Sequence, residues 1–270
     1  MTMAGVVHRK LRAIGATAVG AAAAARDLWL LYLGAIAGLV RGRRGGRPKG
    51  AFAAQLFAIG NQSLVFIAVT LGFIGLVMIY QACQQFNRVT GDLSQVGSQF
   101  LKLAVSDFAP TLTAMMLATR VGAGIAAEIG SMKVTEQIDA LRMSGVLPVD
   151  YLITPRLMAS IVMTIALSIL GGAIMYVAGG LTAYYWFDVN PRIFFDLSAV
   201  TPVAVVLGLL KAASYGAAIP IVAGFAGLRA RGSSEGVGKA TTAAVIGGSF
   251  AVILLDFVIS ATSLVLVGPP

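Results

Sequence analysis

Four ionisable residues lie inside long apolar stretches of this sequence or at their rims: Asp107, Arg120, Lys211 and Asp256. A charged side chain is costly in hydrocarbon, so each of them needs a charged partner, a water-filled cavity or a place near the membrane surface. Side chains of these types can form structural ion pairs, or they can relay protons or ions across a membrane. The sequence leaves both chemistries open.

Two of these residues are predicted to pair. Lys211 stands eleven residues after the start of an expected span at 200–228, and Asp256 stands eleven residues before the end of another at 243–267. Consecutive spans run in opposite directions, so the two side chains lie at one depth and we expect an ion pair. Asp107 is near the outer rim of its span, where water is a sufficient partner.

Arg120 lies deep in the expected span at 106–128, eight residues before Glu128. Its guanidinium is expected to pair with this carboxylate through a neighbouring turn, or to line a polar passage. Either role keeps the charge away from lipid.

No catalytic set accompanies these charges. One cysteine, Cys83, excludes an intrachain disulfide, and one histidine, His8, leaves no His/Cys cluster for a metal. The segment GSSEGVGKAT at 232–241 is similar to a phosphate-binding loop. However, five residues rather than four separate its glycines, and Ala240 stands where Ser or Thr is required. We therefore expect this chain to bind no metal, nucleotide or other cofactor.

A second polar feature is the segment VTEQIDALRMSGVLP at 134–148. Its apolar positions recur at the spacing of one helical stripe: Val134, Ile138, Leu141 and Gly145. Glu136 and Asp139 come early and Arg142 comes late, which suits the helix dipole. Gly145 can cap the C-terminus and Pro148 prevents continuation, so the segment predicts a short surface helix with definite ends.

The elements that position these residues are membrane spans. The chain has 270 residues, of which 58% are hydrophobic and 11% charged, with a mean hydropathy of +0.87. This composition predicts an all-α membrane protein. Five transmembrane helices are expected, near 64–82, 106–128, 157–182, 200–228 and 243–267. A short apolar helix at about 51–59 is expected to end at the sequence GNQS, residues 60–63.

Basic residues are concentrated before the first span. Residues 1–50 hold nine of the 20 basic residues and one acid. Three more basic residues lie between spans two and three and three between spans four and five, whereas the segments on the other side of the membrane hold only three in total: Arg88, Lys102 and Arg192. By the positive-inside rule, the N-terminus and the segment at 134–148 are cytoplasmic and the C-terminus is outside. This distribution suits anionic head groups and argues against nucleic-acid binding.

Three regions are expected along the chain. Residues 1–25 form a basic cytoplasmic tail, residues 26–50 an interfacial helix with a basic linker, and residues 51–270 the domain that holds the five spans. Residues 26–40 are too short to span comfortably and carry Trp29 and Tyr32, which favours a helix lying at the interface over a sixth span.

Three blocks of the sequence carry a family resemblance: TRVGAGIAAEIGSMKVTEQIDALRMSGVLPVDYLITPR (119–156), EGVGKATTAAVI with LLDFVIS (within 235–260), and QLFAIGNQSLVFIAVTLGFIGLVMIYQ (55–81). The chain resembles the MlaE/YrbE permeases, membrane subunits of ABC transporters that move lipids between the inner membrane and the outer envelope. It departs from the family at 106–110, where SDFAP replaces the usual Arg-Glu-Leu-Gly-Pro.

The resemblance implies a homodimer in the bacterial inner membrane, with an ATPase dimer beneath that binds ATP and Mg, and a ring of MCE-domain protein outside. It makes the 134–148 helix the coupling helix on the ATPase. The residues that it implies for this coupling are Glu128, Val134, Glu136, Ile138, Asp139, Leu141 and Arg142.

The resemblance also implies an outward-opening lipid cavity between the first and fifth spans of the dimer. Apolar candidates for its walls are Phe73, Leu76, Val77, Ile79 and Tyr80 in the first span, and Phe250, Ile253, Leu254, Phe257 and Val258 in the fifth.

Two other functions remain open. An ion-driven secondary transporter would use Asp256, Lys211 and Arg120 as a relay, although five spans without self-similar halves speak against it. A scaffold that anchors envelope proteins would have little need for the helix at 134–148.

Overall fold

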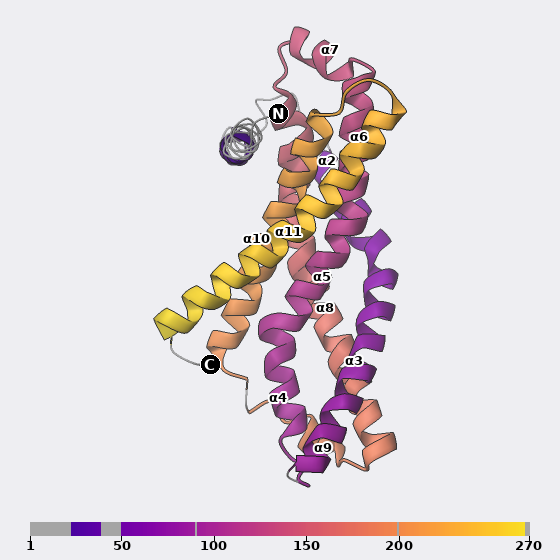
Figure 1. Ribbon diagram of the computed structural model, residues 1–270, viewed down its shortest axis with the longest axis vertical. Helices are drawn as coiled ribbons and strands as arrows, with labels where there is room; N and C mark the ends of the chain where they lie inside the picture. Colours follow the sequence, from indigo (N-terminus) through magenta and orange to yellow (C-terminus); the bar gives the residue numbers. More distant parts are fainter. Residues whose placement is uncertain (1–22, 39–49, 90, 199, 268–270) are drawn as a thin grey trace, which may run out of the picture.

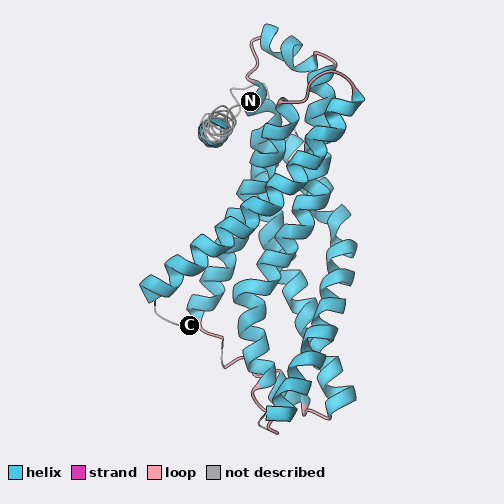
Figure 2. Ribbon diagram, in the orientation of Figure 1, coloured by secondary structure: helices cyan, strands magenta, loops and turns pink. Residues whose placement is uncertain are grey.

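The computed structural model describes residues 23–38, 50–89, 91–198 and 200–267. Within these ranges five helices are long and apolar enough to cross a membrane. They form one elongated bundle, shown in Figures 1 and 2, with the short helix α7 (Gln137–Met143) at one end and the short helix α9 (Pro191–Phe194) at the other. We refer to these as the α7 end and the α9 end. The predicted all-α fold with five spans is confirmed.

Several spans are composite helices with π-helical turns. The first span joins α2 (Ala51–Leu56), the π turn η2 (Phe57–Asn61) and α3 (Gln62–Val89). The second joins α4 (Val96–Leu103), η3 (Ala104–Phe108), α5 (Ala109–Leu117), η4 (Ala118–Gly122) and α6 (Ala123–Val134). The third joins η5 (Val149–Ile153) and α8 (Thr154–Phe187), and the last two are α10 (Pro202–Leu228) and α11 (Ser234–Val267).

The first three spans are longer than the apolar runs that predicted them. Each of the first three contains 39 residues, about 58 Å of helix against about 30 Å of hydrocarbon. Their ends therefore extend beyond the apolar layer. The expected break at residues 60–63 is wrong, because the chain stays helical through η2. Ser63 donates to the Ile59 carbonyl at 2.6 Å and satisfies a backbone group at this turn.

Small residues allow close packing between the spans. A Cβ at Gly75 in α3 would collide with the backbone of Met175 in α8, so these two helices touch directly. The small residues of the second span are all buried, and they face α10 and α11: Ala114, Ala118, Gly122, Ala126 and Gly130. This ridge serves packing within one chain.

Residues 23–38 form a helix beside the α7 end, seen nearly end-on in Figure 1, so its axis runs across the bundle. Ala35 is buried, while Trp29, Leu30 and Leu33 are exposed. The described part of the expected interfacial segment, residues 26–38, is helical throughout and suits a position at the membrane surface. Residues 1–22 of the expected tail and residues 39–49 of the expected linker lie outside the described residues.

Candidate functional site

A three-residue charged cluster lies among η3, α10 and α11. The Lys211 ammonium, whose side chain is only 3% exposed, pairs with Asp256 at 2.8 Å and also with Asp107. The predicted pair between Lys211 and Asp256 is therefore confirmed. The expectation that water alone satisfies Asp107 is wrong. Gly208, one turn before Lys211, has no side chain to hold α10 away from the Val105 carbonyl, and this close approach brings Lys211 to the carboxylate of Asp107.

Hydroxyl groups complete the shell of this cluster. Tyr215 donates to Asp256 at 2.7 Å, and Lys211 donates to the hydroxyl of Ser260 at 2.7 Å. Thr111 makes a longer contact to Asp256, at 3.4 Å. Sequence reasoning missed these residues, although each stands four positions after a charged one: 107 and 111, 211 and 215, 256 and 260. Positions four apart share a helix face, so this spacing was a usable signal.

Arg120 joins the first two spans. Its guanidinium donates to Ser63 at 2.5 Å, to Gln62 at 3.0 Å and to the Ala58 carbonyl at 3.4 Å. The expected pair with Glu128 is wrong, because eight residues along a helix amount to about 12 Å. Glu128 instead accepts from Arg156 of α8 at 2.5 Å. Arg120 thereby holds the π turn η2 at the place where a break was expected.

The segment at 134–148 is split into two helical pieces. Val134 ends α6, Glu136 adopts a left-handed conformation with φ of 59°, and α7 begins at Gln137. The prediction of one helix whose apolar positions begin at Val134 is therefore wrong. The predicted C-terminal cap is confirmed, since Gly145 has φ of 78° and its N–H bonds to the Arg142 carbonyl at 3.0 Å.

The charged face of α7 divides into paired and exposed residues. Asp139 pairs with Lys133 at 3.0 Å and with Arg142 at 3.3 Å, and the hydrogen bond from Lys133 lowers the pKa of the Asp139 carboxyl. Ile138 is fully buried, which ties the helix to the bundle, and Leu141 is partly buried. Glu136 is exposed and makes no ion pair with any described residue. It is thus the carboxylate best placed to meet another protein.

Most apolar candidates for a lipid cavity are exposed in the single chain. Phe73 is 64% exposed on α3, and Phe257 is 73% exposed on α11. The other exposed candidates are Val77, Tyr80, Phe250, Ile253, Leu254 and Val258, while Leu76 is partly buried. Ile79 is fully buried, so it is not available to a ligand. α3 packs along α8, whereas α11 packs along α10 and α6, so one chain does not bring these two faces together.

Comparisons with known proteins agree on one family. A family model described as "Permease MlaE" matches residues 52–262. A probable ABC transporter permease protein of Rickettsia felis is 34% identical over 208 residues, which cover 76% of this chain and 80% of that protein. A similarly named protein of Synechocystis is 36% identical over 211 residues, covering 76% and 79%. The intermembrane phospholipid transport system permease protein MlaE of Haemophilus influenzae is 32% identical over 210 residues, covering 77% and 80%.

Proposed function

Because this chain belongs to the MlaE permease family, we propose that it is the membrane subunit of an ABC transporter that moves phospholipid between the inner membrane and the outer envelope. The chain is a multi-pass membrane protein with five apolar spans. The phospholipid assignment follows the name of the Haemophilus influenzae relative. ATP and Mg bind to a separate ATPase subunit, and a ring of MCE-domain protein stands on the outer side.

The observation that carries this proposal is the helix α7. It stands beyond the bundle at the end of the second span (Figure 1), anchored by Ile138 and presenting Glu136 and Arg142 to solvent. Polar side chains on a firmly anchored helix can transmit the closure of an ATPase dimer to the spans as a rigid-body movement. The excess of basic residues on this side supports a cytoplasmic α7 end and an outer α9 end.

The face of α11 supports a homodimer. In the most apolar 18-residue stretch of α11, only 6% of the residues are buried in the single chain, against 28% to 56% in the corresponding stretches of the other spans. A second copy that packs its α3 against this face would enclose the exposed aromatic residues of both helices. The enclosed space would have apolar walls suited to acyl chains.

The ATPase partnership is tested by reversing one charge. The full chain with Glu136→Lys is purified in mild detergent, and copurifying proteins are identified by mass spectrometry. We expect the amount of ATPase that copurifies with the permease to fall at least about tenfold, because a charge-assisted contact becomes a like-charge or unpaired one. The permease itself should keep its elution volume. Gln137→Lys is the matched control, because it introduces a lysine at the neighbouring position and removes no carboxylate.

The outcome separates two functions. The buried pair of Lys211 with two carboxylates is the observation that favours an ion-driven transporter instead. If no ATPase copurifies with the wild-type chain, and a proton gradient alone drives lipid movement in proteoliposomes, the ABC assignment fails. If the same amount of ATPase copurifies with Glu136→Lys and with wild type, Glu136 does not contribute to the contact with the ATPase.

A further inference from the structure

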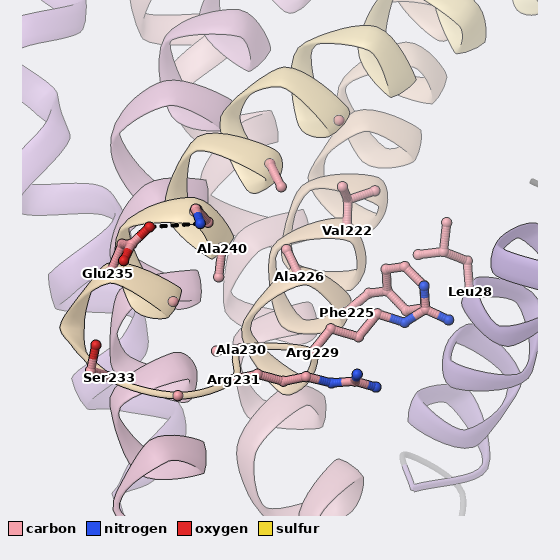
Figure 3. A pocket seen from close by; sticks show the side chains of 15 residues that line it. Leu28, Val222, Phe225, Ala226, Arg229, Ala230, Arg231, Ser233, Glu235 and Ala240 are labelled. Atoms are coloured by element: carbon pink, nitrogen blue, oxygen red, sulfur yellow. Dashed lines mark ion pairs between the residues drawn. The ribbon is translucent and has the colours of Figure 1, made fainter. Parts of the chain in front are cut away.

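A cavity of about 700 Å³ lies at the α7 end, between the helix at 23–38, the end of α10 and the start of α11. Figure 3 shows Leu28 on one side and Glu235 on the other, with Phe225 and two arginines between them. None of the residues proposed for ATPase coupling or for the lipid cavity lines it. The proposed transport function therefore gives this cavity no role.

One end of the cavity is cationic. Arg229 lies 4.2 Å above the Phe225 ring and pairs with Asp27 at 2.9 Å. Lys239 pairs with Glu235 at 2.7 Å. Arg231 is exposed and pairs with no acidic side chain in the part of the chain that the structure describes, which leaves one positive charge uncompensated.

The two arginines are arranged to act together. In Figure 3 their guanidinium groups extend toward the same side, where Leu28 stands. A guanidinium carries five N–H donors, so Arg229 can keep its bond to Asp27 and still donate to a second anion. Paired guanidiniums suit the oxygens of a phosphate group.

The other end of the cavity is apolar. Val222 and Ala226 line it from α10, and Ala243 and Gly247 line it from α11. Val222 stands seven residues before Arg229, about 10 Å further along the helix axis toward the membrane interior. A ligand that fills the whole cavity needs an anionic head and a hydrocarbon chain.

The depth of the cavity points to the same ligand. Leu28 belongs to the helix at 23–38, which runs across the bundle and exposes Trp29, Leu30 and Leu33. Such a helix lies at the boundary between head groups and acyl chains. The arginines are therefore level with lipid phosphates, and the apolar wall is level with the chains below them.

We propose that this cavity binds one acidic phospholipid of the leaflet at the α7 end, with its phosphate on Arg231 and Arg229 and an acyl chain along Val222, Ala226 and Ala243. Because the site joins the surface helix to α10 and α11, the bound lipid braces the helix at 23–38 against the spans. It is separate from the transported lipid, whose proposed cavity is formed by α3 and α11 in the dimer.

The test measures lipid binding to the delipidated full-length protein by native mass spectrometry. Phosphatidylglycerol is the acidic probe and phosphatidylcholine the zwitterionic one. We expect one phosphatidylglycerol per chain to bind in preference to phosphatidylcholine, and Arg231→Gln to weaken its binding about tenfold, the usual effect of one charge-assisted hydrogen bond. Arg192→Gln is the matched control, an exposed arginine at the α9 end that should change nothing.

A second variant separates a lipid from a free anion. Ala243→Phe fills the apolar end from an exposed position without touching a charge. This variant should weaken phosphatidylglycerol binding. Glycerol phosphate, which carries a phosphate but no acyl chain, should not compete with the lipid for the wild-type protein. Binding that is unchanged in Arg231→Gln, or equal for both lipids, would overturn the proposal.

Two further outcomes would assign the cavity to a protein instead of a lipid. Loss of the ATPase from Arg231→Gln with lipid binding unchanged would make it a subunit contact. Loss of the dimer from Arg231→Gln with lipid binding unchanged would make it a contact with a second copy. ATPase copurification is measured on the same samples, so failure of the lipid site remains distinct from failure of the transport function.

Discussion

The ammonium of Lys211 faces two carboxylates, so it is the residue on which the charge balance inside the membrane depends. When all three groups are ionised the cluster carries a net charge of −1. Tyr215 stabilises the negative charge by donating a hydrogen bond to Asp256, and Ser260 accepts a hydrogen bond from Lys211. Removing one acid leaves a neutral pair. Removing the lysine leaves two carboxylates facing each other, and a pair of like charges without a cation is far more costly in a medium of low dielectric constant.

This asymmetry predicts an order of stabilities. Lys211→Met should destabilise the folded protein by about 3 kcal/mol, as expected when a buried ion pair loses one partner. Asp256→Asn should cost only about 1 kcal/mol, because the amide can still bond to Tyr215 and the pair of Lys211 with Asp107 survives. Thermal unfolding followed by size-exclusion chromatography in detergent measures both.

A rescue experiment checks the cause. Neutralising both acids, as Asp107→Asn with Asp256→Asn, should restore most of the stability that Lys211→Met loses, since no unpaired carboxylate remains. Equal losses from Lys211→Met and Asp256→Asn would mean that the cluster is a simple pair and that Asp107 contributes nothing.

At the level of secondary structure, two of the four charged residues in the spans lie in π turns. Asp107 lies in η3, Arg120 lies in η4, and Arg120 bonds to residues in or next to η2. A π turn leaves a backbone carbonyl without its usual helical partner, and such turns are frequent at functional sites. Arg120 donates to the Ala58 carbonyl in η2 at 3.4 Å and so links the first span to the second. A movement of the second span would thus be passed to the first at this point.

The close approach of α10 to η3 predicts a position-specific effect of alanine. Gly208→Ala should destabilise the protein by about 2 kcal/mol, because its Cβ collides with the Val105 carbonyl and separates Lys211 from Asp107. Gly124→Ala is the matched control, a helical glycine in α6 with open space around it. There alanine should be neutral or stabilise by up to about 1 kcal/mol through helix propensity.

The measurement is again thermal unfolding of the purified full chain in detergent. If both alanine variants unfold at the same temperature, the contact at Gly208 does not hold the cluster together. If Gly208→Ala unfolds early and Asp107→Asn in the same chain adds no further loss, the collision acts through the ion pair.

The sequence predicted the long elements well and their tertiary contacts poorly. The five spans follow from apolar runs, and the cap at Gly145 follows from local backbone preference, so both were predictable. The continuous helix through residues 60–63 was not, because bonds from Arg120, some sixty residues away, outweigh the local preference of Gly60 and Asn61. The ion pair of Asp107 was missed because it depends on how closely two helices approach.

For the whole molecule, the exposure of α11 shows that the single chain leaves a large apolar face uncovered. Figure 1 shows the C-terminal half of α11 diverging from α5, and its exposed residues include Phe250, Leu254 and Phe257. Lipid can cover such a face, but a long apolar helix of which so little is buried in its own chain is also what a subunit interface provides. The proposed dimer places α3 of the second copy there.

Disulfide formation between copies tests this arrangement in native membranes. In a chain whose buried Cys83 is replaced by Ala, we expect Val77→Cys combined with Leu254→Cys to give a crosslinked dimer on mild oxidation. Both positions are about half exposed, at 54% and 50%, and lie in the half of their helices nearer the α9 end. Ile169→Cys with Leu254→Cys is the control, because Ile169 is 61% exposed but lies on α8. A dimer band that is as strong with Ile169→Cys would indicate random collision in the membrane. Crosslinking specific to Val77→Cys would mean that the cavity walls come from two chains, so that lipid is enclosed only in the assembled dimer.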